Sequence, residues 1–171
     1  MRLETSPQAV VPGAEVRPER PFALYPLVLL IGVLSIAGFI GGWSLVTDPT
    51  GEAMQADLAW LEGTPVSDFL LPGLFLFFVY GLFGVSVIAG LWTRRSFGPL
   101  RTLDRHSGHH WAMWGAIAIG TVLVAWIAYE LVVIPDVIWL QPALMGVGLA
   151  IVGLTLLPSL RAYGREPSGL R

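Results

Sequence analysis

Glu130 is the residue best placed to do chemistry, because it is an ionisable side chain in an otherwise apolar run. A carboxylate within a membrane helix is a candidate for ligand binding or proton transfer. If its helix begins at Trp111, Glu130 lies about 28 Å further along, at 1.5 Å per residue. That position is near the far surface of a bilayer, so the carboxylate either reaches water there or faces a cavity that opens outward.

Five other polar side chains are candidate partners of Glu130. Four of them lie at the same predicted depth, whereas Tyr80 lies near the middle of the second apolar run. The predicted ligand-binding residues are therefore Glu130, Tyr80, Asp68, Asp136, Gln141 and Asp48. For Tyr80, the alternative role is a hydrogen bond between packed helices. If these groups converge, they could bind a ligand or transfer a proton.

Three histidines could bind a metal only if one rigid helix carried them. His106 and His110 have the i, i+4 spacing that places two ligands on one helix face. Ser107 and Gly108 lie between them and disfavour a helix there. We therefore interpret these residues and His109 as a basic cluster at the membrane interface, and we predict no metal site and no cofactor.

The residues that are missing exclude several kinds of chemistry. The chain has no cysteine, which excludes disulfides, thiol redox chemistry and cysteine-ligated metals. It has no lysine, since all ten basic residues are arginine, and this excludes a Schiff base on a lysine amine. No histidine lies within an apolar run, so two buried histidines cannot hold a haem between helices.

The elements that must position these side chains are membrane helices. Apolar residues make up 54% of the chain and charged residues 13%, whereas a soluble domain has about 25% charged residues. Four apolar runs reach the ~20 residues with which a helix crosses the hydrocarbon core. We predict an all-α bundle of four transmembrane helices over 21–161, with helices at about 22–46, 69–93, 111–134 and 137–160.

The arginines predict how the helices are oriented. All ten lie before the first helix, between the second and third, or after the fourth. By the positive-inside rule, that side is cytoplasmic, here in the inner membrane of a bacterium. We expect a disordered cytoplasmic arm over 1–20, a cytoplasmic tail over 162–171 and an outer loop over 47–68. In this loop, the spacing of Met54, Leu58 and Leu61 predicts a short helix that lies on the membrane surface.

Small residues predict the faces through which the helices pack. Gly38 and Gly42 form a GxxxG pair on the first helix, a pattern that lets two membrane helices approach closely. On the fourth helix, Gly146, Ala150 and Gly153 are predicted to have the same role. A leucine at Gly38 or Gly42 would force the two backbones apart.

Three segments of the chain are distinctive as sequences. They are GGWSLVTDPTG over 41–51, WLEGTPVSDFLLPG over 60–73, and WIAYE over 126–130 followed by LQP over 140–142. In these segments the chain resembles a family of small bacterial four-helix membrane proteins of unassigned function, over about residues 35–160. The resemblance implies the topology given above and a gathering of the distinctive residues at the outer surface. It implies no activity.

These observations favour a protein that is not an enzyme, because no catalytic set of residues is complete. We predict that the protein is a membrane component that acts either as an accessory subunit or as a binder of lipid or of a small apolar ligand. The expected partners are membrane lipids and either a larger membrane complex or further copies of this chain, with no nucleic acid. The alternative function is a small transporter or proton-coupled protein that uses Glu130.

Overall fold

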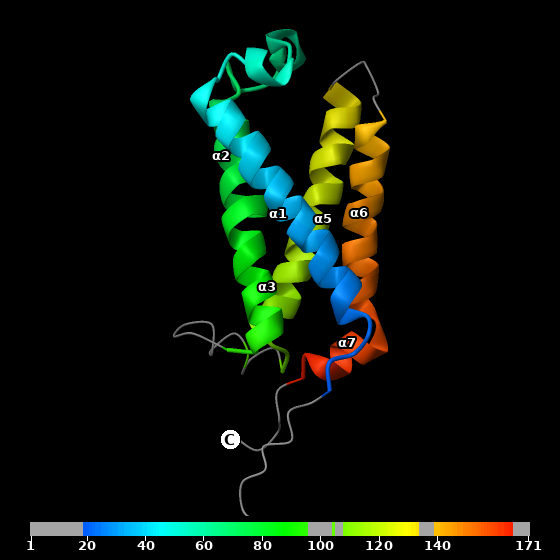
Figure 1. The fold of residues 1–171 in the computed structure, drawn as a ribbon. Helices are drawn as coiled ribbons and strands as arrows, with labels where there is room; N and C mark the ends of the chain where they lie inside the picture. Colours follow the sequence, from blue (N-terminus) through cyan, green and yellow to red (C-terminus); the bar gives the residue numbers. More distant parts are fainter. Residues whose placement is uncertain (1–18, 96–103, 105–107, 134–138, 166–171) are drawn as a thin grey trace, which may run out of the picture.

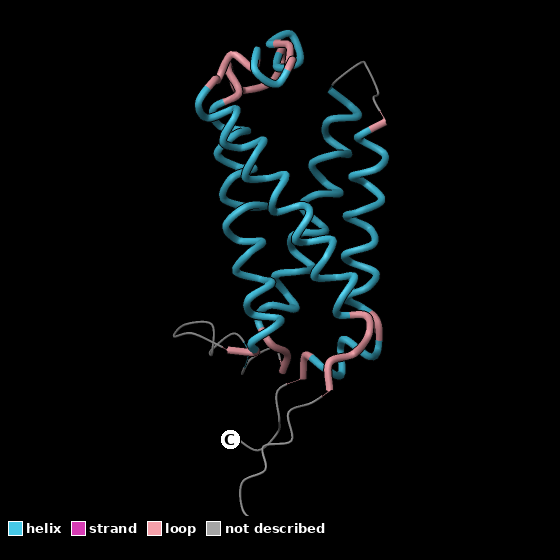
Figure 2. The backbone as a smooth tube through the Cα atoms, in the orientation of Figure 1, coloured by secondary structure: helices cyan, strands magenta, loops and turns pink. Residues whose placement is uncertain are grey.

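The structure is a computed structural model that describes residues 19–95, 104, 108–133 and 139–165. Its described part is built from helices, with no strand among them (Figures 1 and 2). In chain order the helices are α1 (Leu24–Thr47), η1 (Glu52–Met54), η2 (Leu58–Leu61), α2 (Leu70–Phe75), η3 (Leu76–Leu82), α3 (Phe83–Thr93), α5 (Trp111–Val133), α6 (Leu140–Leu156) and α7 (Pro158–Tyr163).

Three helical stretches are long and apolar enough to cross a membrane. They are Leu24–Thr47, Leu70–Thr93 and Trp111–Val132. The second of them is continuous although it is divided into α2, η3 and α3. α6 is also apolar but has only 17 residues. This composition is typical of an integral membrane protein.

The helices form two hairpins that meet at one end of the molecule. α1 packs along α2, η3 and α3 to form the first hairpin, and α5 packs along α6 to form the second. The hairpins contact each other through α3 with α5 and through α1 with α6. They lie close together at the end that holds α7 and draw apart toward the end that holds η1 and η2 (Figure 1). We call these the terminal end and the loop end.

The most deeply buried side chains join the two hairpins near the terminal end. Several of them are 0–2% exposed, and they come from both hairpins: Leu24, Leu27, Ile31, Val87, Leu91, Ala112, Ala116 and Leu160. Close packing of this kind holds α3 and α1 against the second hairpin. The hairpins are therefore fixed to each other at the terminal end.

Within the first hairpin, α1 packs through the glycine face that its sequence predicts. A Cβ atom at Gly42 would lie 2.6 Å from the Phe77 nitrogen and 2.8 Å from the Gly73 oxygen. A Cβ at Gly38 would lie 2.8 Å from the Cβ of Tyr80. Only glycine allows backbones to approach so closely, which is the physical basis of GxxxG packing.

In the second hairpin, the predicted packing face of α6 is wrong. Among the described residues, nothing lies within 4 Å of a Cβ placed at Gly146 or at Gly153. The contact with α5 instead uses Gly148, since a Cβ at Gly120 would lie 2.8 Å from the Gly148 oxygen. Both glycine sets have helical spacing, so glycine spacing alone could not choose between them, although the polar residues Gln141 and Thr155 lie on the same buried face as Gly148.

α6 ends at Leu156, before the end of the predicted helix at 160. Leu157 has an extended ψ of 139°, because a proline clashes with a helical residue before it. Pro158 then begins the short helix α7. α7 lies across the terminal end instead of continuing α6 toward the tail (Figure 1).

The loop between α1 and α2 also differs from its prediction. Instead of one helix through Met54, Leu58 and Leu61, it has two single 3₁₀ turns, η1 and η2. Gln55 between them has a positive φ of 55°, which ends the first turn. No amphipathic α-helix is therefore present over 54–61.

Candidate functional site

The structure brings together two of the six predicted site residues, Tyr80 and Glu130. Tyr80 is 1% exposed, and its hydroxyl has no hydrogen-bond partner among the residues that the structure describes. Glu130 is half-buried, and it is linked to Tyr80 through the side chains of Trp126 and Phe75. The pair thus places a buried hydroxyl of the first hairpin near a carboxylate of the second.

Two aromatic side chains bridge the hairpins beside this pair. Phe75 of α2 stacks on Trp126 of α5, with ring centroids 4.7 Å apart and an interplanar angle of 19°. Phe75 also contacts Tyr80, with the two ring centroids 5.6 Å apart and the ring planes at 90° to each other. These rings enclose the Tyr80 hydroxyl in an apolar setting. We call Phe75, Tyr80, Trp126 and Glu130 the inter-hairpin site.

Trp126 directs Glu130 into the molecule. Its indole Nε1 donates a hydrogen bond of 2.5 Å to Oε1 of Glu130, one helical turn away. Side chains on a helix lean toward its N-terminus, and the N-terminus of α5 is at the terminal end. The Glu130 carboxylate therefore leans from the loop end toward the middle of the bundle. No role in a site was predicted for Trp126, although its i, i+4 spacing from Glu130 is a signal that could have identified it.

Tyr80 lies on a stretch of π-helix, which the sequence did not predict. η3 is π-helical over Leu76–Leu82, and it is followed by a hydrogen bond from the Phe83 N–H to the Phe78 carbonyl, five residues back. Stretches of π-helix are rare in proteins, and those that occur are often found at functional sites. Here the wider turn changes the angular positions of the residues that follow it, including the side of the helix on which Tyr80 lies.

Two of the other predicted site residues, Asp48 and Asp68, lie in the loop between α1 and α2 and bond there instead. Asp68 accepts a hydrogen bond of 3.0 Å from the Leu70 N–H in the first turn of α2. Gln141 is buried at the start of α6. Asp136 lies outside the described residues. Two of these side chains therefore have structural roles.

Asp48 organises the loop from the end of α1. Its Oδ1 accepts a hydrogen bond of 2.6 Å from the Thr50 hydroxyl, and its Oδ2 accepts one of 2.8 Å from the Ala53 N–H. Both bonds favour the charged carboxylate and so lower the pKa of Asp48 below its ordinary 3.8. The bond from Thr50 has the larger effect. This stabilisation of the loop is fully present when the pH is above the ordinary pKa of an aspartate. It is lost as the pH falls through the lowered pKa of Asp48 in the folded protein.

We expect Asp48→Asn to loosen this loop at neutral pH, because an amide replaces one of the two acceptor oxygens. Limited proteolysis should cut the variant within 48–69 several times faster than the original chain. The original chain should show the same acceleration only well below about pH 4. Glu62→Gln is the control, since Glu62 is exposed in the same loop. Equal cleavage of both variants would show that Asp48 does not hold the loop.

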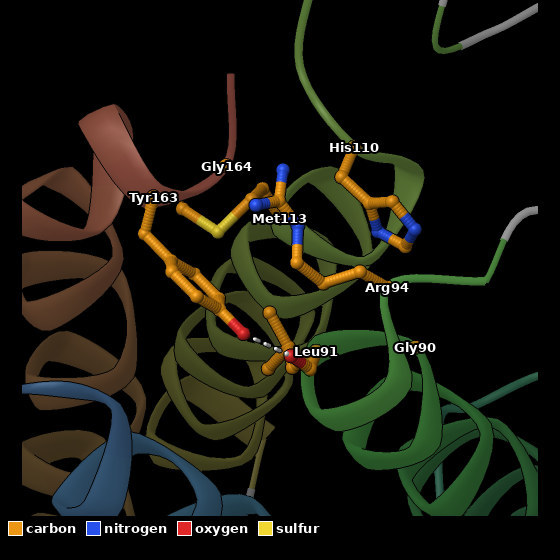
Figure 3. A pocket seen from close by; sticks show the side chains of 7 residues that line it. All are labelled: Gly90, Leu91, Arg94, His110, Met113, Tyr163 and Gly164. Carbon is orange, nitrogen blue, oxygen red and sulfur yellow. Dashed lines mark hydrogen bonds between the residues drawn. The ribbon is translucent and has the colours of Figure 1, made fainter. Parts of the chain in front are cut away.

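A second polar cluster lies at the terminal end, where the sequence predicted only a basic surface (Figure 3). The backbone N–H of His110 donates a hydrogen bond of 2.8 Å to the Gly164 carbonyl, which connects the start of α5 to the end of α7. His110 itself is 2% exposed. His106 lies outside the described residues, and among the described ones no three His, Asp or Glu side chains could hold a metal ion.

The inter-hairpin site has limited chemical capacity. It offers one hydroxyl and one carboxylate between apolar and aromatic side chains, a set that recognises a polar group on an otherwise apolar molecule. The comparisons with known proteins add nothing to this, since no family model, no curated protein and no solved structure matches the chain. The proposals below therefore depend on the site's own geometry.

Proposed function

We propose that this chain is a four-helix protein of a bacterial inner membrane, with its terminal end in the cytoplasm. The fourth span is α6, whose 17 residues extend about 25 Å, near the lower limit for crossing a bilayer. α6 also packs along α5, which is itself long enough to cross. The orientation is supported by arginine placement: Arg20, Arg94 and Arg161 all lie at or near the terminal end, and the loop between α1 and α2 has no arginine.

Its function, in this proposal, is to bind a membrane-soluble molecule, either a lipid or a small apolar ligand, between its two hairpins. The observation that carries this is the Tyr80 hydroxyl, which is 1% exposed and has no partner among the described residues. Leaving a buried polar group unpaired destabilises a protein by about 1–3 kcal/mol. A ligand that accepts a hydrogen bond from Tyr80 would remove this penalty.

A photoreactive probe tests this proposal. The purified full chain in mild detergent is labelled with a long-chain fatty alcohol that carries a diazirine, and the labelled peptides are identified by mass spectrometry. We expect labelling of the peptides that contain Phe75 and Trp126. Tyr80→Phe should weaken the binding of the probe about two- to tenfold, as expected for the loss of one hydrogen bond.

Tyr129→Phe is the matched control, because Tyr129 is exposed on α5 and the same oxygen is removed there. It should leave the labelling unchanged. Tyr80→Phe should also leave the ligand-free protein at least as stable as the original, since the hydroxyl that it removes has no partner among the described residues. Equal labelling of the two variants would contradict the proposed site.

A second function, proton-coupled transport, is favoured by one observation. Glu130 lies in a membrane-length helix, and its carboxylate accepts a hydrogen bond from Trp126 inside the bundle; intramembrane carboxylates of this kind are found along proton pathways. In proteoliposomes with a pH-sensitive dye inside, such a transporter should carry protons, and Glu130→Gln should abolish this flux. A binder should give no flux above empty vesicles, and Glu130→Gln should still be labelled by the probe.

A further inference from the structure

Arg94 is held in a fixed position where α3 ends. It adopts a left-handed conformation with φ 53°, which turns the chain away from the helix. One guanidinium nitrogen donates to the Arg165 carbonyl at 3.0 Å, and the guanidinium carbon lies 4.9 Å from the centre of the Tyr163 ring. Tyr163 is itself fixed, since its hydroxyl donates to the Leu91 carbonyl at 3.1 Å. Figure 3 shows Arg94 beside Tyr163, with the hydrogen bond from Tyr163 to Leu91 dashed.

This cation has no counter-ion within the part of the chain that the structure describes. No carboxylate there pairs with Arg94. The acidic Asp104 is buried and accepts a hydrogen bond from the Trp111 N–H at the start of α5. A guanidinium has five N–H donors, and Arg94 uses one nitrogen for Arg165. Its other donors remain available to an anion.

The surroundings of Arg94 have the composition of a membrane interface. At this end of the bundle Trp92 is exposed, and the guanidinium of Arg20 lies over its ring at 4.1 Å, whereas Trp111 and Tyr163 are buried. An exposed tryptophan at a helix end is typical of the level of the lipid headgroups. A shallow surface hollow, lined by Gly90, His110 and Met113 among others, adjoins the guanidinium (Figure 3).

We propose that Arg94 is a binding site for the phosphate of an anionic membrane lipid. A planar guanidinium can bind two phosphate oxygens at once, which gives it geometric selectivity as well as charge. Because Arg165 and Tyr163 hold the side chain in place before the anion binds, little further rotamer freedom is lost on binding. Arg161 on α7 is exposed, and no side chain or carbonyl of the described residues holds its guanidinium in the same way. This site is separate from the inter-hairpin site and does not depend on the function proposed for it.

The test is a titration of phosphatidylglycerol into the detergent-solubilised full chain, followed by native mass spectrometry. Arg94→Gln should weaken the first bound lipid about fivefold, as expected for one arginine near an anionic surface. Arg161→Gln removes the same charge from the same end and should change binding less than twofold. Arg94→Lys keeps the charge but not the bidentate geometry, so its affinity should lie between those of Arg94→Gln and the original chain.

Two further measurements separate a lipid from other sources of phosphate. Phosphatidylcholine, which has no net charge, should bind several times more weakly than phosphatidylglycerol. Inorganic phosphate in the millimolar range should not displace the bound lipid. Displacement by inorganic phosphate would reassign the site to a soluble anion. Equal weakening by Arg94→Gln and Arg161→Gln, in variants that melt at the same temperature as the original chain, would show that only diffuse charge is involved and would overturn the proposal.

Discussion

Replacing Gly42 with leucine should destabilise the protein by about 3 kcal/mol or more, near the upper end for an overpacked core. A Cβ at this position would lie 2.6 Å from the backbone nitrogen of Phe77 and 2.8 Å from its Cβ. A flexible side chain could move aside, but a backbone nitrogen moves only with its helix. The leucine would therefore separate α1 from α2 and η3 along their whole contact.

Thermal unfolding in detergent, or titration with a denaturing detergent, measures this loss. Ala37→Leu is the matched control, because Ala37 lies on the exposed side of α1. Surface substitutions usually change stability by no more than about 0.5 kcal/mol. If both variants unfold at the same point as the original chain, the face of Gly42 is turned toward lipid and the first hairpin is not packed as described.

The second large effect is expected on α6, where two glycines two residues apart should respond differently. Gly148→Leu should destabilise the protein by about 3 kcal/mol, because a Cβ at Gly148 would lie 2.8 Å from Val124 and 3.0 Å from the Gly120 oxygen. Gly146→Leu should be nearly neutral, since nothing described lies within 4 Å of its Cβ position. The two substitutions make the same chemical change in the same helix, at positions only two residues apart along it.

The free energy of unfolding of the two variants, measured under one set of detergent conditions, tests this prediction. A third variant, Gly153→Leu, should behave as Gly146→Leu does, since it also faces away from the described residues. Loss of stability in Gly146→Leu together with a neutral Gly148→Leu would mean that α6 is rotated by about half a turn about its axis. It would then present the face that its sequence alone had predicted.

The helical, membrane-length character of this chain could be read from its sequence because it is a local property. A run of about 20 apolar residues must satisfy its backbone hydrogen bonds internally, and a helix does this within one segment. The same local reasoning identified Gly38 and Gly42, since a GxxxG pair lies on one face of any straight helix.

The sequence failed where several faces of a helix look alike. α6 is largely apolar and has glycines on two faces, and contact with α5 showed that the packed glycine is Gly148, which lies in line with the buried Gln141 and Thr155. The end of α6 is a different case, because Pro158 marked it locally. The prediction extended the helix to residue 160 on hydrophobicity and overlooked the effect of proline on the residue before it.

Only the tertiary structure decided which residues, far apart in the sequence, lie next to each other. Tyr80 and Glu130 were both candidates, but so were Asp48 and Asp68, and no spacing rule relates residues on different helices. The π-helical turn of η3 and the closure of the hairpins at the terminal end set the position of Tyr80 relative to α5. Arg94 was one of ten similar arginines until the fold placed Tyr163 and the Arg165 carbonyl beside it. Local chemistry therefore determined the helices, whereas packing between helices selected the side chains that form each site.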